Sequence, residues 1–147
     1  MKEISILGST GSIGTQALDV VRENRDKFAV KALSCGRNIE LMKAQISEFE
    51  PQLVVTETAD DAKLLRAYFK DKTRNIEFAY GEEGLLELAR YDADLLLNSL
   101  SGMRGMLPTY EAIKAGRNIA LANKESLVAG GGVIMSSAAE MGVKILP

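Results

Sequence analysis

The sequence contains no histidine and only one cysteine, Cys35, among its 147 residues. The commonest metal ligand is therefore missing, and a lone cysteine can form neither a disulfide framework nor a cysteine-rich zinc site. No stretch approaches the roughly 20 apolar residues that span a membrane. The apolar run after Met1 is too short for the core of a signal peptide. These absences predict a cytoplasmic protein with no membrane partner and no metal site of its own.

Charge of neither sign dominates the chain. Lys and Arg number 18 and Asp and Glu number 20, which gives a formal net charge of -2 at pH 7. Nothing in this balance indicates nucleic acid as a partner. Hydrophobic residues make up 46% and charged residues 26%, as is typical of a globular protein. The length fits one domain with one buried core.

Apolar runs of strand length alternate with segments of helical periodicity. Several runs are apolar at successive positions, as in Leu95-Leu96-Leu97, which is typical of strands covered on both faces. Between the runs, apolar residues recur at helical spacing, and the first such stripe is Ile13, Ala17, Val20 and Val21. The expected strands are Ile4–Leu7, Val30–Ser34, Leu53–Thr56, Ile76–Tyr80, Ala93–Asn98, Ile119–Ala122 and Val143–Leu146. The alternation predicts an α/β fold, namely a Rossmann-like, doubly wound, mostly parallel sheet with helices on both faces.

The last expected strand is followed directly by Pro147, where the sequence stops. In an α/β sheet a functional loop normally follows a strand at this point. We therefore expect the sequence to be a fragment of a longer protein.

Three glycines, Gly8, Gly11 and Gly14, follow the first strand in the segment GSTGSIG. A strand, a glycine turn and a helix in succession form the context of a phosphate-binding loop. We expect Gly8 to make the turn, Gly11 to let the backbone approach a ligand, and Gly14 to let the helix pack near the sheet. The alternative is a glycine turn that binds nothing.

Donors for an anion are expected in the same loop. The backbone N–H groups from Thr10 to Ile13 should be exposed, and the positive end of the helix dipole should support them. The hydroxyls of Ser9, Thr10 and Ser12 would add further donors. This arrangement suits the pyrophosphate of a dinucleotide.

The end of the second strand indicates which dinucleotide. A site for NAD would place Asp or Glu there to accept a hydrogen bond from the ribose 2′-hydroxyl, but the segment SCGRN has no acid before Glu40. Arg37 instead offers a planar guanidinium suited to a 2′-phosphate, and Ser34 and Asn38 can donate beside it. The segment therefore favours NADP(H), and the alternative is that Arg37 is a solvated surface charge.

Two further loops follow strands on the carboxyl side of the expected sheet, where ligands of such sheets gather. In NSLSGMRGMLPT, Asn98 to Thr109, two glycines and a proline would bring backbone near the nicotinamide half of the cofactor, unless they simply cap a helix. In LANKESLVAGGG, Leu121 to Gly132, an amide, an ammonium and a carboxylate follow one another. They could contact cofactor and substrate, or they could be surface charges behind a helix cap.

Taken together, the segments GSTGSIG, CGRN, GMLPT and LANKESLV resemble the 1-deoxy-D-xylulose 5-phosphate reductoisomerase family, in order and over essentially the whole chain. The resemblance implies an oxidoreductase of non-mevalonate isoprenoid biosynthesis that isomerises and reduces 1-deoxy-D-xylulose 5-phosphate to 2-C-methyl-D-erythritol 4-phosphate. A divalent metal, Mg or Mn, would hold neighbouring substrate oxygens while a carbon–carbon bond migrates, and NADPH would supply the hydride. The resemblance also implies a sugar-phosphate substrate and a homodimeric parent enzyme.

The resemblance assigns roles to individual residues. It places Thr10, Gly11, Ser12 and Ile13 in the cofactor-phosphate loop and Gly36, Arg37 and Asn38 at the adenosine 2′-phosphate. It makes Asn123 and Glu125 contacts of NADPH and Lys124 a contact of the substrate. In relatives the acidic metal ligands follow the point where this sequence stops. We therefore expect residues 1–147 to be the NADPH-binding domain, without the metal-binding catalytic domain and the C-terminal helical domain, and to be inactive alone.

Two other functions remain open from the residues. One is the cofactor domain of a different NADP-dependent oxidoreductase, related to aspartate-semialdehyde dehydrogenase, which would need a catalytic cysteine and histidine further along. The other is a non-catalytic nucleotide-sensing domain. The segment SGMRGM also differs from the small-residue version common in reductoisomerases, so the nicotinamide contacts are not fixed by the resemblance.

Overall fold

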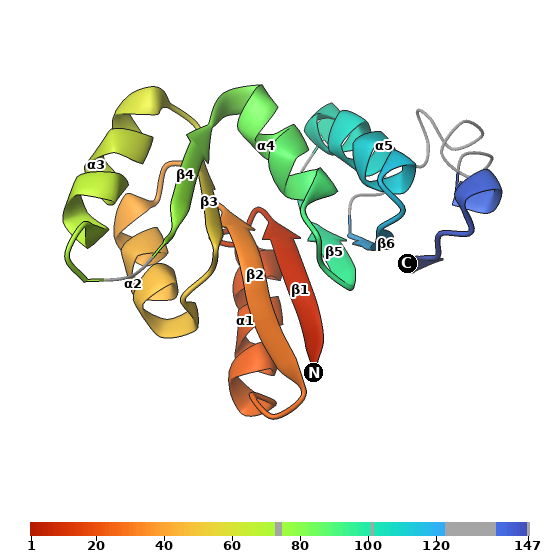
Figure 1. The fold of residues 1–147 in the computed structure, drawn as a ribbon, viewed down its shortest axis with the longest axis horizontal. Coiled ribbons are helices and arrows are strands. Elements are labelled where there is room, and N and C mark those ends of the chain that lie inside the picture. Colours follow the sequence, from red (N-terminus) through yellow and green to blue (C-terminus); the bar gives the residue numbers. More distant parts are fainter. Residues whose placement is uncertain (73–74, 101, 123–137, 147) are drawn as a thin grey trace.

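The computed structural model describes residues 1–72, 75–100, 102–122 and 138–146. Within these ranges a single seven-stranded sheet runs in the order β4-β3-β2-β1-β5-β6-β7, and every neighbouring pair is parallel (Figure 1). The strands are β1 Lys2–Leu7, β2 Phe28–Ser34, β3 Leu53–Thr56, β4 Glu77–Tyr80, β5 Leu95–Asn98, β6 Asn118–Leu121 and β7 Ile145–Leu146. The predicted doubly wound α/β fold is confirmed, and each expected strand is present with small shifts at its ends.

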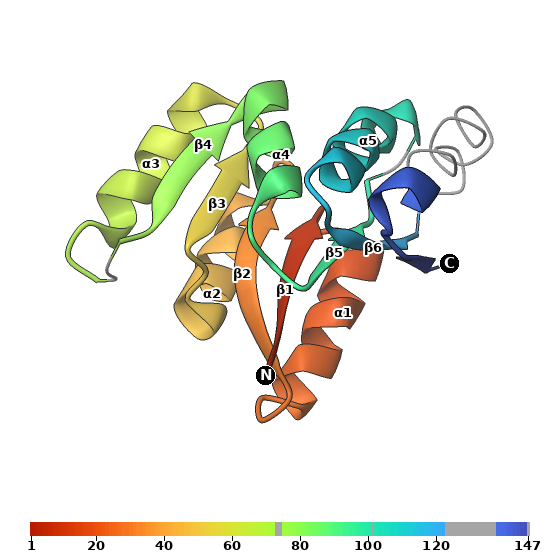
Figure 2. The ribbon, with the colours of Figure 1, turned by 45° about the vertical axis from the view of Figure 1, so that its right-hand side comes forward.

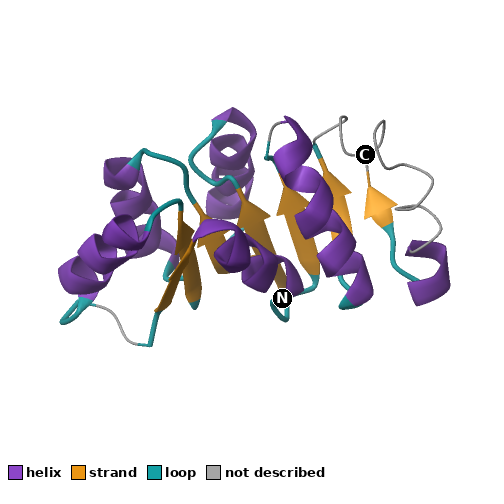
Figure 3. Ribbon diagram, turned by 90° about the horizontal axis from the view of Figure 1, so that it is seen from above, coloured by secondary structure: helices purple, strands orange, loops and turns teal. Residues whose placement is uncertain are grey.

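Helices cover both faces of the sheet, which is seen as one layer of strands between them in Figure 3. They are α1 Ser12–Glu23, α2 Ile39–Phe49, α3 Ala59–Phe69, α4 Gly81–Arg90 and α5 Met106–Lys114, with a 3₁₀ turn, η1, at Gly102–Gly105. The first three helices pack on one core cluster and the last two on the other. Because successive strand residues point to opposite faces, Val54 belongs to the first cluster and Val55 to the second. This is why β3 is buried at all four positions.

The buried face of α1 differs from the stripe that the sequence predicts. Ile13 and Val20 are 47% and 53% exposed, whereas Gly14, Leu18 and Val21 are buried. The spacing is helical in both sets, but the helix is turned so that its glycine faces the sheet. A helix can approach a sheet most closely where no side chain intervenes, so Gly14 and not Ile13 sets the rotation.

All strands point the same way, so the loops after β1, β2, β3 and β5 lie at one edge of the sheet (Figure 2). β1 lies between β2 and β5, and the chain therefore leaves it in opposite directions along the sheet. Such a switch point is where ligands bind in doubly wound folds. Among the helices that the structure describes, none is long and apolar enough to cross a membrane.

Candidate functional site

The turn after β1 has the geometry that its glycines predict. Gly8 has a positive φ of 83°, a conformation that other residues adopt only at a cost. Its N–H donates to Ser34 Oγ at 2.8 Å. A Cβ added at Gly14 would lie 2.2 Å from the Gly8 carbonyl oxygen, so the helix can sit against the turn only because residue 14 is glycine. The expected roles of Gly8 and Gly14 are confirmed.

Ser9 does not supply the donor that the sequence predicts. Its side chain is fully buried, and Ser9 Oγ lies 2.7 Å from Gln45 Oε1 and 3.0 Å from the Ser34 carbonyl oxygen. Gln45 Nε2 in turn donates to the Ser9 carbonyl oxygen at 2.9 Å. The Ser9 hydroxyl is therefore spent on fixing the turn from below, and it is not available to a ligand.

The first turn of α1 leaves backbone donors open. The helix begins at Ser12 after Gly11, which provides no side-chain cap, and the first helical hydrogen bond runs from Thr15 N to the Gly11 carbonyl. Within the described residues nothing accepts from the N–H groups of Ser12 and Ile13. The Gly11 N–H departs from the predicted open row, because it donates to the Gly8 carbonyl oxygen at 3.3 Å. The remaining open amides form an anion site at the positive end of a twelve-residue helix.

The loop after β2 lies against this turn. Gly36 N donates to Thr10 Oγ1 at 3.4 Å, so the Thr10 hydroxyl keeps its own hydrogen for another acceptor. Arg37 is exposed, and no hydrogen bond or ion pair joins it to any other described residue. Asn38 caps α2, since its Oδ1 accepts from Leu41 N at 3.1 Å, and its side-chain NH₂ remains free to donate. The structure thus brings the Gly36–Asn38 segment beside the amides of α1.

Ser34 was expected to donate beside Arg37, and this expectation is wrong. Ser34 is 1% exposed. Its hydroxyl oxygen accepts from Gly8 N, and its carbonyl oxygen accepts from Ser9 N at 2.7 Å. Because both groups hold the β1 turn, Ser34 shapes the anion site without reaching a ligand.

The loop after β5 is tied to the same turn. Ser99 Oγ lies 2.6 Å from the Leu7 carbonyl oxygen and 3.1 Å from that of Gly8. The buried Asn98 side chain donates to the Gly105 carbonyl oxygen at 2.9 Å and to Thr109 Oγ1 at 2.7 Å. These bonds fold η1 back over the sheet and lead into α5. The sequence prediction used the glycines of this loop and missed Asn98, although a polar residue closing an apolar strand was a usable signal.

A cavity of about 500 Å³ opens at the ends of β2 and β3, beside Gly36. Its lining comes from four separate segments: Cys35, Thr56, Glu57, Gly81, Glu82, Leu85 and Arg104. The sequence prediction did not single out Glu57 or Arg104, because no local pattern places them together. Cys35 was expected to be inert core, and it is a free, buried thiol. Burial, with the negative charges of Asp61 and Glu57, raises its pKa to about 12.

The predicted contacts Asn123, Lys124 and Glu125 lie outside the residues that the structure describes. Among the residues that it does describe, no group of three or more His, Cys, Asp or Glu side chains could hold a metal ion. The described part of the site therefore combines an anion-binding helix terminus, a guanidinium without a partner and an adjoining cavity.

Comparison with known proteins gives the family. A family model described as 1-deoxy-D-xylulose 5-phosphate reductoisomerase matches residues 4–131. The chain is 51% identical over 148 residues to the 1-deoxy-D-xylulose 5-phosphate reductoisomerase of Shouchella clausii (strain KSM-K16), and the match covers all of this chain and 38% of that protein.

Solved structures agree with this result. A DOX-P reductoisomerase in complex with NADPH, fosmidomycin and magnesium is 32% identical with a TM-score of 0.94, over all of this chain and 36% of that one. The Zymomonas mobilis 1-deoxy-D-xylulose 5-phosphate reductoisomerase in complex with NADPH is 32% identical with a TM-score of 0.91, over 99% and 38% of the two chains. The chain thus spans less than two fifths of the length of these relatives. It belongs to the 1-deoxy-D-xylulose 5-phosphate reductoisomerase family.

Proposed function

We propose that residues 1–147 are the NADPH-binding domain of an enzyme that isomerises and reduces 1-deoxy-D-xylulose 5-phosphate to 2-C-methyl-D-erythritol 4-phosphate. The observation that carries the proposal is the pairing of open amides at Ser12 and Ile13 with the unpartnered Arg37, held beside them by the Gly36–Thr10 contact. Relatives solved with NADPH share the fold over the same region. Family membership favours this function over a semialdehyde dehydrogenase or a sensing domain.

In the proposed complex the turn after β1 holds the pyrophosphate. The amides of Ser12 and Ile13 donate to its oxygens, and the Thr10 and Ser12 hydroxyls add to them. The extended backbone at Gly11, with φ of -82° and ψ of 179°, presents no side chain, so the diphosphate can approach the main chain. Helix α1 adds its dipole, which favours a negative charge at this end.

The adenosine 2′-phosphate is placed at Gly36, Arg37 and Asn38. A guanidinium can bind two phosphate oxygens at once and stays charged at every physiological pH. The free NH₂ of Asn38 adds a neutral donor, and its carbonyl oxygen is already committed to α2. No carboxylate from the β2 loop competes for the ribose, because the first acid after Ser34 is Glu40.

The remaining assignments rest on the family resemblance. Asn123 and Glu125 are proposed to contact NADPH, and Lys124 is proposed to contact the substrate phosphate or a developing negative oxygen. NADPH would supply hydride, and a divalent ion, Mg²⁺ or Mn²⁺, would hold the substrate oxygens. The ligands of that ion are proposed to lie in a separate catalytic domain, which a C-terminal helical domain follows. The enzyme is proposed to be a cytoplasmic homodimer.

The cofactor assignment is tested by calorimetric titration of the 147-residue chain with NADPH and NADH. We expect NADPH to bind more tightly by about tenfold or more, the difference expected for a charge-assisted phosphate contact. Arg37→Ala should remove most of that preference and leave NADH binding within about twofold. Arg25→Ala is the matched control, because this exposed arginine lies in the loop before β2, at the opposite edge of the sheet. Equal affinity of the unaltered chain for both cofactors would overturn the assignment.

The division into domains is tested by activity. Residues 1–147 mixed with NADPH, Mg²⁺ and 1-deoxy-D-xylulose 5-phosphate are expected to consume no cofactor, because the metal ligands are proposed to lie elsewhere. Consumption that depends on the metal would contradict the proposed division.

A further inference from the structure

The cavity beside Gly36 adjoins the proposed 2′-phosphate site but is not part of it. Its walls come from the ends of β2 and β3, the start of α4 and the η1 turn. Its volume of about 500 Å³ is within the range of ligand pockets, roughly 300–1,000 Å³. Cys35 and Leu85 contribute apolar surface, and the raised pKa of Cys35 keeps its thiol neutral. The cavity is therefore suited to a ligand that is flat and mostly uncharged.

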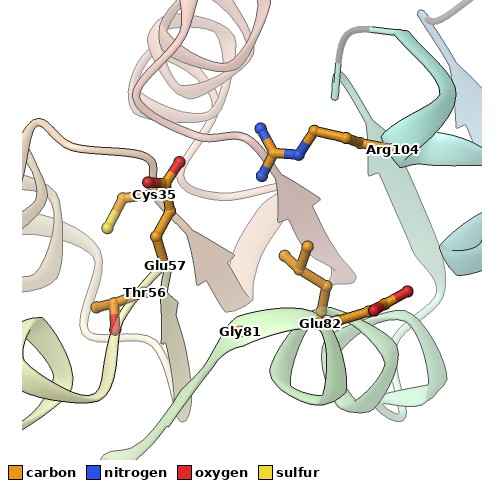
Figure 4. Close-up of a pocket in the computed structure, with 7 residues that line it drawn as sticks. Cys35, Thr56, Glu57, Gly81, Glu82 and Arg104 are labelled. Carbon is orange, nitrogen blue, oxygen red and sulfur yellow. The ribbon is translucent and has the colours of Figure 1, made fainter.

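Two opposite charges face this cavity. The Glu57 carboxylate lies beside Gly36, since its Oε1 would be 3.6 Å from a Cβ added there. Figure 4 shows the Arg104 guanidinium extending over the cavity from η1, while the Glu82 carboxylate points away from Glu57. No hydrogen bond or ion pair joins Glu57 or Arg104 to any residue that the structure describes. Both groups are thus available to a ligand between them.

The geometry of a dinucleotide decides which part of it reaches this cavity. The 2′-phosphate and the base are substituents of the same ribose, and the pyrophosphate leaves that ribose on its other side. With the pyrophosphate at α1 and the 2′-phosphate at Arg37, the base must lie in the space next to Gly36. The cavity occupies that space.

We infer that this cavity binds the adenine base, that Glu57 accepts a hydrogen bond from its 6-amino group, and that the Arg104 guanidinium stacks on its plane. The inference rests on the proposed function and adds recognition of the base to it. A carboxylate accepts from an amine but repels the 6-oxo group of hypoxanthine. A guanidinium stacks on flat aromatic surfaces. Glu57 and Arg104 are thus determinants of base specificity and affinity.

The test compares NADPH with its hypoxanthine analogue, reduced nicotinamide hypoxanthine dinucleotide phosphate, by calorimetry. We expect the unaltered chain to prefer the adenine cofactor by about tenfold, the discrimination of one charge-assisted hydrogen bond. Glu57→Gln should reduce the preference to about twofold or less, because the amide can donate to the 6-oxo group. Glu83→Gln, an exposed acid of α4 outside the cavity lining, should keep the full preference. Circular dichroism checks that each variant is folded.

Arg104 is tested with both natural cofactors. Arg104→Ala should weaken NADPH and NADH by the same factor, about three- to tenfold for a lost stacking cation. A loss confined to NADPH would place Arg104 on the 2′-phosphate and overturn its assignment to the base.

The outcomes separate this inference from the proposed function. If the chain prefers NADPH to NADH through Arg37 but binds the adenine and hypoxanthine forms equally, only the base pocket is overturned. An unchanged adenine preference in Glu57→Gln has the same meaning. If the chain binds no NADPH, the proposed function fails and the base pocket fails with it.

Discussion

Ser9 and Gln45 are joined by two hydrogen bonds although 36 residues separate them in the sequence. Ser9 lies in the turn after β1 and Gln45 in α2, and they are 0% and 4% exposed. One side-chain amide therefore satisfies both the hydroxyl and the carbonyl of a turn residue that water does not reach. The shape of the proposed phosphate loop depends on a side chain from the next helix.

Gln45→Met tests this dependence. The variant keeps most of the volume and removes both hydrogen bonds, so the Ser9 carbonyl is left buried without its partner. We expect the free energy of unfolding to fall by about 2 kcal/mol, measured by urea denaturation, and NADPH to bind more weakly because the loop is less ordered. Gln16→Met is the control, because Gln16 is exposed on α1, and it should leave both quantities nearly unchanged. A stable Gln45→Met chain would show that the pair does not hold the turn.

The two later glycines of the loop should respond differently to alanine. At Gly14 an added Cβ meets the backbone at 2.2 Å and 2.6 Å, whereas at Gly11 the nearest atom is 3.7 Å away and φ is an ordinary -82°. Gly14→Ala should therefore destabilise the chain by about 1–3 kcal/mol. Gly11→Ala should keep its stability within about 0.5 kcal/mol but weaken NADPH binding, because the methyl group occupies the path of the diphosphate.

Thermal unfolding and NADPH titration of the two variants check this contrast. If Gly11→Ala bound NADPH as tightly as the unaltered chain, the diphosphate could not lie against the main chain at that residue. If Gly14→Ala were fully stable, α1 would have room to shift, and the close approach would not be a requirement of the fold.

The contrast between Gly14 and Ser9 shows what the sequence can predict. Strand runs, the turn at Gly8 and the close packing at Gly14 follow from local patterns, because each depends on residues a few positions apart. The fate of a hydroxyl does not, since Ser9 and Ser34 look like ligand donors until the fold brings Gln45 and Gly8 to them.

The cavity escaped sequence analysis for the same reason. Glu57 follows β3 and Arg104 belongs to η1, and only the strand order brings their loops to one edge. The rotation of α1 was also misjudged, because a periodicity count treats glycine as neutral although its small size sets which face is buried. Local chemistry is thus readable from the sequence, and contacts between distant segments are not.

Asn98 gives a prediction with a pH dependence. Its amide donates to Gly105 O and Thr109 Oγ1 and its Oδ1 accepts from Leu100 N. In Asn98→Asp the carboxylate cannot donate, and it faces a carbonyl oxygen without water. We expect a loss of about 3 kcal/mol or more at pH 7.

Burial raises the pKa of the new carboxyl above its unfolded value, so the variant is most stable relative to the unaltered chain when the carboxyl is protonated. The deficit should therefore shrink as the pH falls toward 4 and grow as it rises, as measured by denaturation at several pH values. Asn118→Asp is the control, because Asn118 Oδ1 only accepts from Lys144 N and a carboxylate can replace it. A deficit independent of pH would mean that the amide donor is not what holds η1.

Cys35 provides the last prediction. Its pKa is raised from 9.0 to about 12, first by burial and then by the charges of Asp61 and Glu57. An acid whose pKa is raised in the folded state stabilises the fold fully below its unfolded pKa, and this contribution is lost as the pH rises from about 9 toward 12. The stability of the unaltered chain should therefore fall more steeply over that window than the stability of Cys35→Ala. Because the thiolate is the reactive form, iodoacetamide should alkylate the native chain at pH 8 far more slowly than the urea-unfolded chain. Equal rates would mean that the thiol is ionised in the fold, and the neutral wall that the adenine pocket requires would be lost with it.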